Sequence, residues 1–180
     1  HPVTTEYETS LDDVTQTIIA IQNLSLPTVW IWPNMDAGSD GVSKAIRVYR
    51  EQVKPKHVRF FKSLPIEHFA PLLSQASCIV GNSSAGIREA SYLGTPCINI
   101  GSRQGGKFKT KNVINSGYSH KEILKGIKKA LNNNFKKKLS KLKNPYEPKI
   151  SIKEIINMIL NIKVNNKLIN KKFVNKTIKF

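Results

Sequence analysis

The fold is decided by one stretch of the sequence, residues 78–90, which runs Cys78-Ile79-Val80-Gly81-Asn82-Ser83-Ser84-Ala85-Gly86-Ile87-Arg88-Glu89-Ala90. A short apolar run gives way to small polar residues and then to a helical pattern. This order predicts a buried strand followed by an exposed helix start near Ser84. We expect a ligand at that junction.

The residue types at this junction favour an anionic ligand. Ser83 and Ser84 stand where a helix N-cap is expected, and Gly86 lets a ligand approach backbone N–H groups that carry partial positive charge. A phosphate or diphosphate suits such a pocket. Glu89 follows one turn later, where it can accept hydrogen bonds from sugar hydroxyls. The alternative is an ordinary capped helix whose serines bind nothing.

The net charge of +17 is concentrated in the last third of the chain. Residues 1–120 hold 12 Lys and Arg against 9 Asp and Glu, whereas residues 121–180 hold 17 against 3. The last third is rich in lysine, asparagine and isoleucine, a mixture that a bias toward A/T-rich codons can produce without any selected partner. A cationic face can hold RNA or an anionic membrane non-specifically. No base-reading motif accompanies the charge, so we expect no specific nucleic-acid partner and no membrane partner.

The two cysteines, Cys78 and Cys97, stand in apolar runs and are expected to be small core residues. No residues have metal-ligand spacing, and we expect neither a metal nor a cofactor. No apolar run approaches the about 20 residues that span a bilayer, and no secretory signal is present, so we expect a cytoplasmic location. The chain begins at His1 without Met, and we expect it to be the later part of a longer protein.

Strand and helix patterns alternate along most of the chain. Apolar runs predict strands at residues 28–32, 58–61, 78–81 and 97–100. Helical periodicity predicts helices at residues 11–23 with Ser10 as N-cap, at about 40–52, at 65–76, from about 84, and at 120–131. The alternation predicts an α/β fold with a doubly wound parallel sheet and right-handed crossovers.

Ligands of such sheets bind beyond the carboxyl ends of the strands. This rule gathers four loops at one rim, namely residues 34–39, 62–64, 83–86 and 101–106. The last of these, Gly101-Ser102-Arg103-Gln104-Gly105-Gly106, places glycines around Arg103, whose guanidinium can pair with a phosphate through two parallel hydrogen bonds. A solvated turn is the alternative, but the position at the rim favours function.

In the C-terminal third, the pattern predicts a helix with a lysine-rich outer face at residues 135–142 and a further helix at residues 151–162. In the second of these, the apolar residues Ile152, Ile155, Ile156, Ile159 and Leu160 are expected to face a core. The pattern weakens beyond Lys163, so residues 163–180 are expected to form a basic C-terminal extension.

Four motifs occur in one order along the chain. They are His1-Pro2-Val3-Thr4-Thr5-Glu6, Pro33-Asn34-Met35-Asp36-Ala37-Gly38-Ser39, Gly81-Asn82-Ser83-Ser84-Ala85-Gly86-Ile87-Arg88-Glu89 and Gly94-Thr95-Pro96-Cys97-Ile98-Asn99-Ile100-Gly101-Ser102-Arg103-Gln104. Together they closely resemble the C-terminal domain of UDP-N-acetylglucosamine 2-epimerases. The resemblance spans roughly residues 1–160.

The resemblance implies a GT-B fold, in which two Rossmann-like domains close over a nucleotide sugar. Residues 1–162 would be the C-terminal, UDP-binding half, and the N-terminal half would be absent from this sequence. The full-length protein is expected to be a homo-oligomer that binds a UDP-amino sugar.

The resemblance also assigns roles to individual residues. Position by position, it implies that Ser83, Ser84 and Gly86 contact the diphosphate and that Arg103 lines the cleft near the phosphates. It places Glu89 at the ribose, and Ser63 and Leu64 near the uracil. Finally, it implies that Asn34 contacts the substrate and that His1 approaches the substrate from the domain hinge as a catalytic residue.

The sequence of the serine motif resembles that of the hydrolysing branch of the family. Non-hydrolysing enzymes usually have Asp-Ser-Gly-Gly where this chain has Asn82-Ser83-Ser84-Ala85-Gly86. The hydrolysing reaction removes the sugar C2 proton while UDP leaves C1, and water then adds to give the free 2-epimeric sugar for nonulosonic acid synthesis.

One departure concerns Asn144-Pro145-Tyr146, which is followed by Glu147-Pro148-Lys149 instead of the family's glycine-rich loop. The acidic residues that the family uses for proton transfer belong to the N-terminal domain. We therefore expect this chain alone to bind UDP weakly and to turn nothing over. The alternatives are a non-hydrolysing epimerase, the donor domain of a GT-B glycosyltransferase, and a non-enzymatic module whose basic C-terminal third holds anionic polymers.

Overall fold

The computed structural model describes residues 1–3, 8–34, 38–139 and 150–165. The chain divides into two compact units, His1–Tyr146 and Glu147–Phe180. The first unit holds all of the described strands and the predicted rim. The division at residue 162 that the family resemblance implies stays a prediction.

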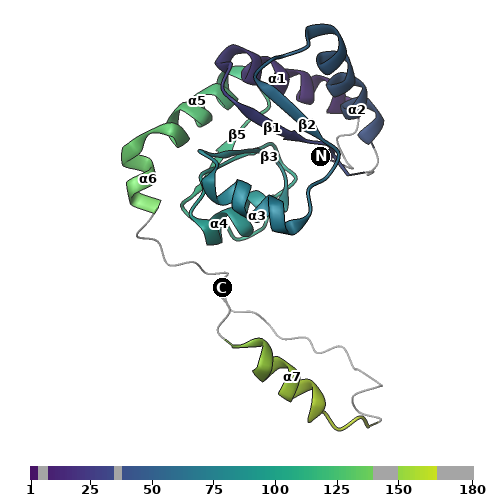
Figure 1. The fold of residues 1–180 in the computed structure, drawn as a ribbon, viewed down its shortest axis with the longest axis vertical. Helices are drawn as coiled ribbons and strands as arrows, with labels where there is room; N and C mark the ends of the chain where they lie inside the picture. The colour runs from purple at the N-terminus through teal and green to yellow at the C-terminus, as the bar shows by residue number, and fades with distance from the viewer. Residues whose placement is uncertain (4–7, 35–37, 140–149, 166–180) are drawn as a thin grey trace. The chain divides into compact units, whose positions relative to one another are not determined.

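The described strands are all paired in parallel, as predicted (Figure 1). β1 (Thr28–Ile31) pairs with β2 (Val58–Phe61), with Thr28 opposite Val58. β3 (Ile79–Gly81), β4 (Cys97–Ile100) and β5 (Val113–Ser116) form a second ladder in the order β3-β4-β5. Parallel pairing puts the carboxyl ends of the strands on one side within each ladder.

β5 was not predicted from the sequence. Its residues, Val-Ile-Asn-Ser, include only two β-branched apolar side chains, and the strand lies half-exposed at the edge of its ladder. An edge strand covers less apolar surface than a central one, so its sequence pattern is weak. β4, by contrast, is buried at all four positions and was predicted with the bounds observed.

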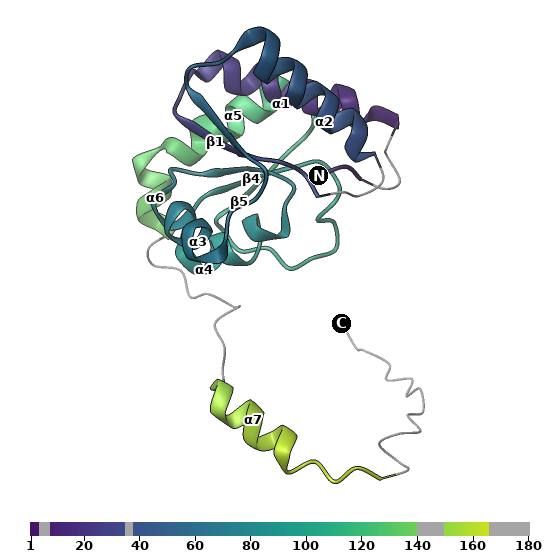
Figure 2. The same ribbon diagram turned by 45° about the vertical axis from the view of Figure 1, so that its right-hand side comes forward.

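The helices cover both faces of the strands, which confirms the doubly wound α/β arrangement. Figure 2 shows α1 (Ser10–Leu24), α2 (Ser39–Val48) and α5 (His120–Leu131) above the strands, with α3 (Ile66–Gln75) and α4 (Glu89–Leu93) below them. α1 packs against both α2 and α5, and α3 packs against α4. A π-helical turn (Tyr49–Val53) continues α2, and α6 (Asn133–Leu139) follows α5.

The start of α1 differs from the prediction. Thr9 occupies the N-cap position, and Ser10 is the first helical residue. Ser10 is buried, and its hydroxyl donates to the carbonyl of Gly38 at 3.3 Å instead of capping the helix. A tertiary hydrogen bond between α1 and the start of α2 has therefore replaced the local one.

The core lies between the strands and the layer that contains α1 and α5. Its buried members are Ala20, Ile21, Tyr49, Val58, Ile98, Ile100, Ile123, Ile127 and Ala130. Gly126 lets α5 approach β4 closely, because a Cβ at that position would lie 3.1 Å from Cγ2 of Ile98. This core fixes β4, and with it the loop that follows β4 at the rim.

The second unit contains α7 (Ile152–Leu160), where the prediction of an inward-facing apolar stripe is wrong. The exposed fractions of Ile152, Ile155, Ile156, Ile159 and Leu160 range from 41% to 77%. Ser151 and Glu154 form a capping box that satisfies the start of the helix locally. Amphipathic spacing predicts which face of a helix is apolar and does not show what covers that face.

The remaining C-terminal predictions fall largely outside the described residues. α6 begins at Asn133, and residues 140–142 of the predicted helix are not described. The expected extension at 163–180 is described only as far as residue 165. Among the described helices, none is both long and apolar enough to cross a bilayer.

Candidate functional site

The turn after β3 holds the serines that the sequence predicts as an anion site. Gly81 has φ +138°, a conformation that favours glycine, and Ser83 is extended. The hydroxyl of Ser83 accepts a hydrogen bond from the backbone N–H of Ala85 at 3.3 Å, and the carbonyl of Ser83 accepts one from the N–H of Gly86 at 3.1 Å. These bonds close a compact turn at the carboxyl end of β3.

The helix predicted from about Ser84 is instead a short 3₁₀ turn, Ser84–Gly86, followed by α4. The carbonyl of Ser84 accepts hydrogen bonds from the N–H groups of both Ile87 and Arg88, and α4 itself has only five residues. A helix this short has a small dipole. The N–H groups of residues 85–88 donate within the turn, so an anion here would bind mainly through the hydroxyl groups of Ser83 and Ser84.

Gly86 allows the turn to lie directly on β4. A Cβ at this position would overlap the Sγ of Cys97, which is 2% exposed. The position therefore needs a residue without a side chain, because the turn and the strand are already in contact.

His1 lies between the ends of β1 and β3. Its main-chain nitrogen donates to Oδ1 of Asn82 at 2.8 Å, and its carbonyl accepts from Nδ2 of Asn82 at 2.7 Å. Its ring Nδ1 accepts from the backbone N–H of Asn34 at 3.2 Å, beside the end of β1 (Figure 1). The neutral imidazole must therefore carry its proton on Nε2. The structure thus brings His1 and Asn34 together.

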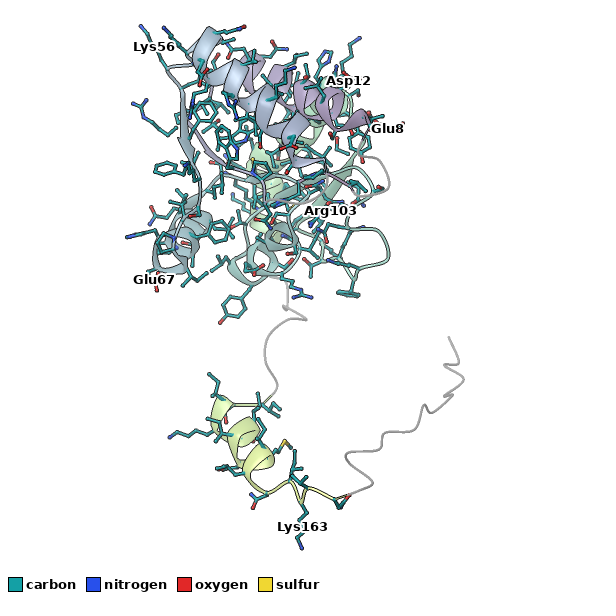
Figure 3. The ribbon with its side chains drawn as sticks, turned by 90° about the vertical axis from the view of Figure 1, so that its right-hand side faces the viewer. Glu8, Asp12, Lys56, Glu67, Arg103 and Lys163 are labelled. Carbon is teal, nitrogen blue, oxygen red and sulfur yellow. The ribbon has the colours of Figure 1, made fainter. Side chains whose placement is uncertain are left out.

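The loop after β4 folds onto the same point. Gly101 has φ +71°, and a Cβ there would overlap the ring of Tyr118. Beyond it, Nη1 of Arg103 and Nε2 of Gln104 both donate to the main-chain carbonyl of Asn82, at 3.2 and 2.7 Å. Arg103, labelled in Figure 3, thus joins the cluster of His1 and Asn34.

Asn82 and Gln104 are the residues that sequence reasoning missed, although both stand in motifs it quoted. Asn82 is 9% exposed and Gln104 is fully buried. The available signal was the pair Gly81-Asn82, in which a glycine at a strand end precedes an amide side chain that can both donate and accept.

The other predicted site residues lie elsewhere. Glu89 begins α4 and is exposed, and it lines an open groove of about 560 Å³ together with Ile66, Phe69, Ala70, Leu73, Arg88, Tyr92 and Leu93. Ser63 is exposed and Leu64 half-buried in the connection between β2 and α3. Within the described residues, no hydrogen bond joins Ser63, Leu64 or Glu89 to the cluster around Asn82. Figure 3 shows Glu67, on the first turn of α3, well apart from Arg103.

Cys78 and Cys97 are both free thiols, and Cys97 is buried in β4, as expected of a core residue. Burial raises the pKa of Cys97 to about 12, with a smaller contribution from Cys78. Burial also raises the pKa of Cys78 to about 11, partly offset by Lys136. In the described residues, no three His, Cys, Asp or Glu side chains are grouped closely enough to hold a metal ion.

These shifts predict an alkaline loss of stability. The folded chain keeps both thiol protons above pH 9.0, the ordinary pKa, where the unfolded chain loses them. The stabilisation is complete below pH 9 and is lost as the pH rises toward 11 to 12. We expect the free energy of unfolding, measured by urea denaturation, to fall by up to about 1.4 kcal/mol per pH unit for each thiol. The Cys78→Ala/Cys97→Ala variant should have a shallower slope, and an unchanged slope would contradict this account.

Comparison with known proteins decides the family. The family model for UDP-N-acetylglucosamine 2-epimerase matches residues 1–160. The chain belongs to the UDP-N-acetylglucosamine 2-epimerase family. This epimerase-family chain is 35% identical over 130 residues to a UDP-N-acetylglucosamine 2-epimerase of Neisseria meningitidis, covering 72% of this chain and 33% of the relative.

Two relatives carry a more specific name. A UDP-N,N'-diacetylbacillosamine 2-epimerase (hydrolyzing) of Legionella pneumophila is 29% identical over 171 residues, which covers 95% of this chain and 44% of the relative. A GDP/UDP-N,N'-diacetylbacillosamine 2-epimerase (hydrolyzing) of Campylobacter jejuni is 29% identical over 118 residues, covering 64% of this chain and 30% of the relative. The chain therefore spans between about a third and less than half of the length of these epimerases.

A solved structure matches the epimerase fold. The crystal structure of a Methanocaldococcus jannaschii UDP-GlcNAc 2-epimerase in complex with UDP-GlcNAc and UDP aligns with a TM-score of 0.65 and 16% sequence identity. The alignment covers 85% of this chain and 41% of that one. The predicted fold, the α/β half of a GT-B-like enzyme, is thereby confirmed.

Proposed function

We propose that the chain is the UDP-binding half of a hydrolysing UDP-N-acetylglucosamine 2-epimerase, which converts UDP-GlcNAc or a related UDP-2-acetamido sugar to the free 2-epimeric sugar and UDP. One observation supports this above the others. In a chain of the epimerase family, His1 and Arg103 both bind Asn82, and Asn34 binds the His1 ring, directly beside the turn that holds Ser83 and Ser84.

The diphosphate would lie against the Ser83–Gly86 turn. The hydroxyl groups of Ser83 and Ser84 can donate to it, and the Arg103 guanidinium supplies positive charge, whereas Gly86 makes room for β4 and not for the ligand as the sequence suggested. Departure of UDP places negative charge on the leaving diphosphate, and donors that are already in position stabilise that charge as it develops.

Glu89 would accept hydrogen bonds from the ribose hydroxyls. It lines the groove between α3 and α4, and the turn with Ser63 and Leu64 directly precedes the residues of α3 that line the same groove. A uracil near Ser63 and Leu64 would thus lie beside the start of α3, and a ribose at Glu89 would lie three residues beyond the Ser83–Gly86 turn.

The reaction would proceed in two balanced steps. A base removes the proton from C2 of the sugar, a C1–C2 double bond forms, and the C1–O bond breaks to release UDP and a 2-acetamidoglucal. Water then adds, with its hydroxyl going to C1 and a proton going to the opposite face of C2. The acid and base groups for these proton transfers would come from an N-terminal domain, with His1 approaching the sugar from the domain boundary.

The serine motif supports the hydrolysing branch. The Legionella and Campylobacter relatives both carry the word hydrolyzing in their names. A non-hydrolysing epimerase is the second candidate, because the Neisseria relative has higher identity, 35%, and a name without that word.

Product analysis with UDP-GlcNAc tests the proposal. We expect the 180-residue chain alone to give no product, and a reaction that also supplies the N-terminal domain to release UDP and free N-acetylmannosamine, both followed by NMR. A UDP-linked epimer without release of UDP would instead assign the non-hydrolysing branch. Turnover by the chain alone, or transfer of the sugar only to an added acceptor, would contradict the proposal.

A further inference from the structure

Asn82, at the end of β3, contacts two other segments of the chain. Its side chain binds His1, and its main-chain carbonyl accepts from Arg103 and Gln104. Its side chain is almost fully buried, at 9% exposure, so these bonds are shielded from competing water. A single residue thus connects the start of the chain, the serine turn and the loop after β4.

The contact with His1 has the pattern of a strand pair. In an antiparallel ladder, two opposing residues exchange both an N–H···O and a C=O···H–N bond. The Asn82 amide does the same with one residue, since Oδ1 accepts from the His1 nitrogen and Nδ2 donates to the His1 carbonyl. Two bonds to one residue fix both its position and its orientation, and the His1 ring is then placed to accept from the N–H of Asn34.

The main-chain carbonyl of Asn82 organises the loop after β4. Gln104 is fully buried and donates to this carbonyl at 2.7 Å, which holds the middle of the loop. Arg103 donates to the same oxygen at 3.2 Å through Nη1. One of the nitrogens of the guanidinium is therefore held next to the serine turn.

We propose that Asn82 is the positioning residue of the site: its side chain fixes the His1 residue beside the Ser83–Gly86 turn, while its main-chain carbonyl, which any residue would supply, holds the Arg103 guanidinium. The proposal rests on the proposed function, because it assigns to Asn82 the geometry in which the rim receives a UDP-sugar. Asn82 acts through His1 and Arg103 and not on the reacting atoms, so changing it should affect the arrangement of the rim before any ligand is added.

The test compares two backbone amides in the unliganded 180-residue chain by solvent-exchange NMR. The Asn34 amide donates to the His1 ring, whereas the Trp32 amide donates to the carbonyl of Phe61 in the β1–β2 ladder at 2.8 Å. In the Asn82→Ala variant, we expect exchange of the Asn34 amide to become about tenfold faster and that of Trp32 to stay within about twofold. General destabilisation would accelerate both amides alike.

A matched control is Asn115→Ala. Asn115 is exposed on β5, and its Oδ1 accepts from Nδ2 of Asn99, so this variant also loses an amide hydrogen bond without touching His1. Its Asn34 exchange should match that of the unchanged chain. The proposal is overturned if Asn82→Ala accelerates Asn34 less than about threefold, or if Trp32 accelerates as much as Asn34.

UDP titration adds a second arm. Alanine keeps the main-chain carbonyl that Arg103 and Gln104 bind, so we expect Asn82→Ala and Asn115→Ala both to leave UDP affinity within about twofold. A loss of UDP affinity of about tenfold in Asn82→Ala alone would mean that Asn82 acts on the diphosphate site instead of through His1, and would overturn the proposal. If the unchanged chain fails to bind UDP, the proposed function fails, and the exchange comparison still decides whether Asn82 positions His1.

Discussion

Replacing Gly86 with alanine is expected to remove most UDP binding and to lower the free energy of unfolding by about 1–3 kcal/mol, a typical cost of overpacking a filled interior. The new Cβ would overlap the Sγ of Cys97. Cys97 is 2% exposed within a strand that is buried at every position, so the turn must move away from β4. The hydroxyls of Ser83 and Ser84 move with it. Calorimetric titration with UDP and urea denaturation measure the two effects.

A second substitution provides the control. Cys97→Ala removes the sulfur, after which the nearest atom to the new Cβ would be the Cβ of residue 97, at an ordinary 3.6 Å. The Gly86→Ala/Cys97→Ala variant should therefore recover UDP binding relative to Gly86→Ala. If the double variant binds UDP as poorly as the single one, contact with Cys97 is not the reason for glycine at this position.

Replacing Ile98 with alanine is expected to destabilise the first unit by about 2–5 kcal/mol, the usual cost of truncating a fully buried aliphatic side chain. Ile98 is 0% exposed in the middle of β4, packed below Gly126 of α5. The cavity would open between the helix and the strand that supports the Arg103 loop. Thermal unfolding followed by circular dichroism measures the loss.

Ile156→Ala is the matched control. This residue lies on α7 and is 48% exposed, so the same chemical change should alter the free energy of unfolding by no more than about 0.5 kcal/mol. Comparable destabilisation by the two substitutions would mean that α7 is packed into a core, contrary to its exposure here.

Most of the fold was predictable because it depends on local patterns. The runs at 58–61 and 97–100 gave strands with the observed bounds, because aromatic and β-branched side chains favour strands. β5 and the exposure of α7 were missed for one shared reason. Both depend on what lies beside the segment, and a sequence window does not contain its neighbours.

The site was predictable in outline only. The rule that ligands bind at the carboxyl ends of strands predicted Asn34 and Arg103 at one rim, whereas only the family resemblance placed His1 near the substrate. The hydrogen bonds that join His1 to Arg103 pass through Asn82, which is 81 residues from His1 and 21 from Arg103 in the chain. Such long-range polar contacts have no local signature. The 3₁₀ turn at Ser84 could not be predicted from local sequence either, because Gly86 of this turn packs against Cys97 of β4.

The central claim is that the Ser83–Gly86 turn and the Arg103 loop bind the diphosphate of UDP. Titration of the ¹⁵N-labelled chain with UDP, followed by amide chemical shifts, tests it most directly. We predict saturable shifts at Ser83, Ser84, Gly86 and Arg103, weaker shifts with uridine, and none on α7. Shifts confined to the lysine-rich segments, or equal responses to UDP and uridine at the turn, would contradict the account.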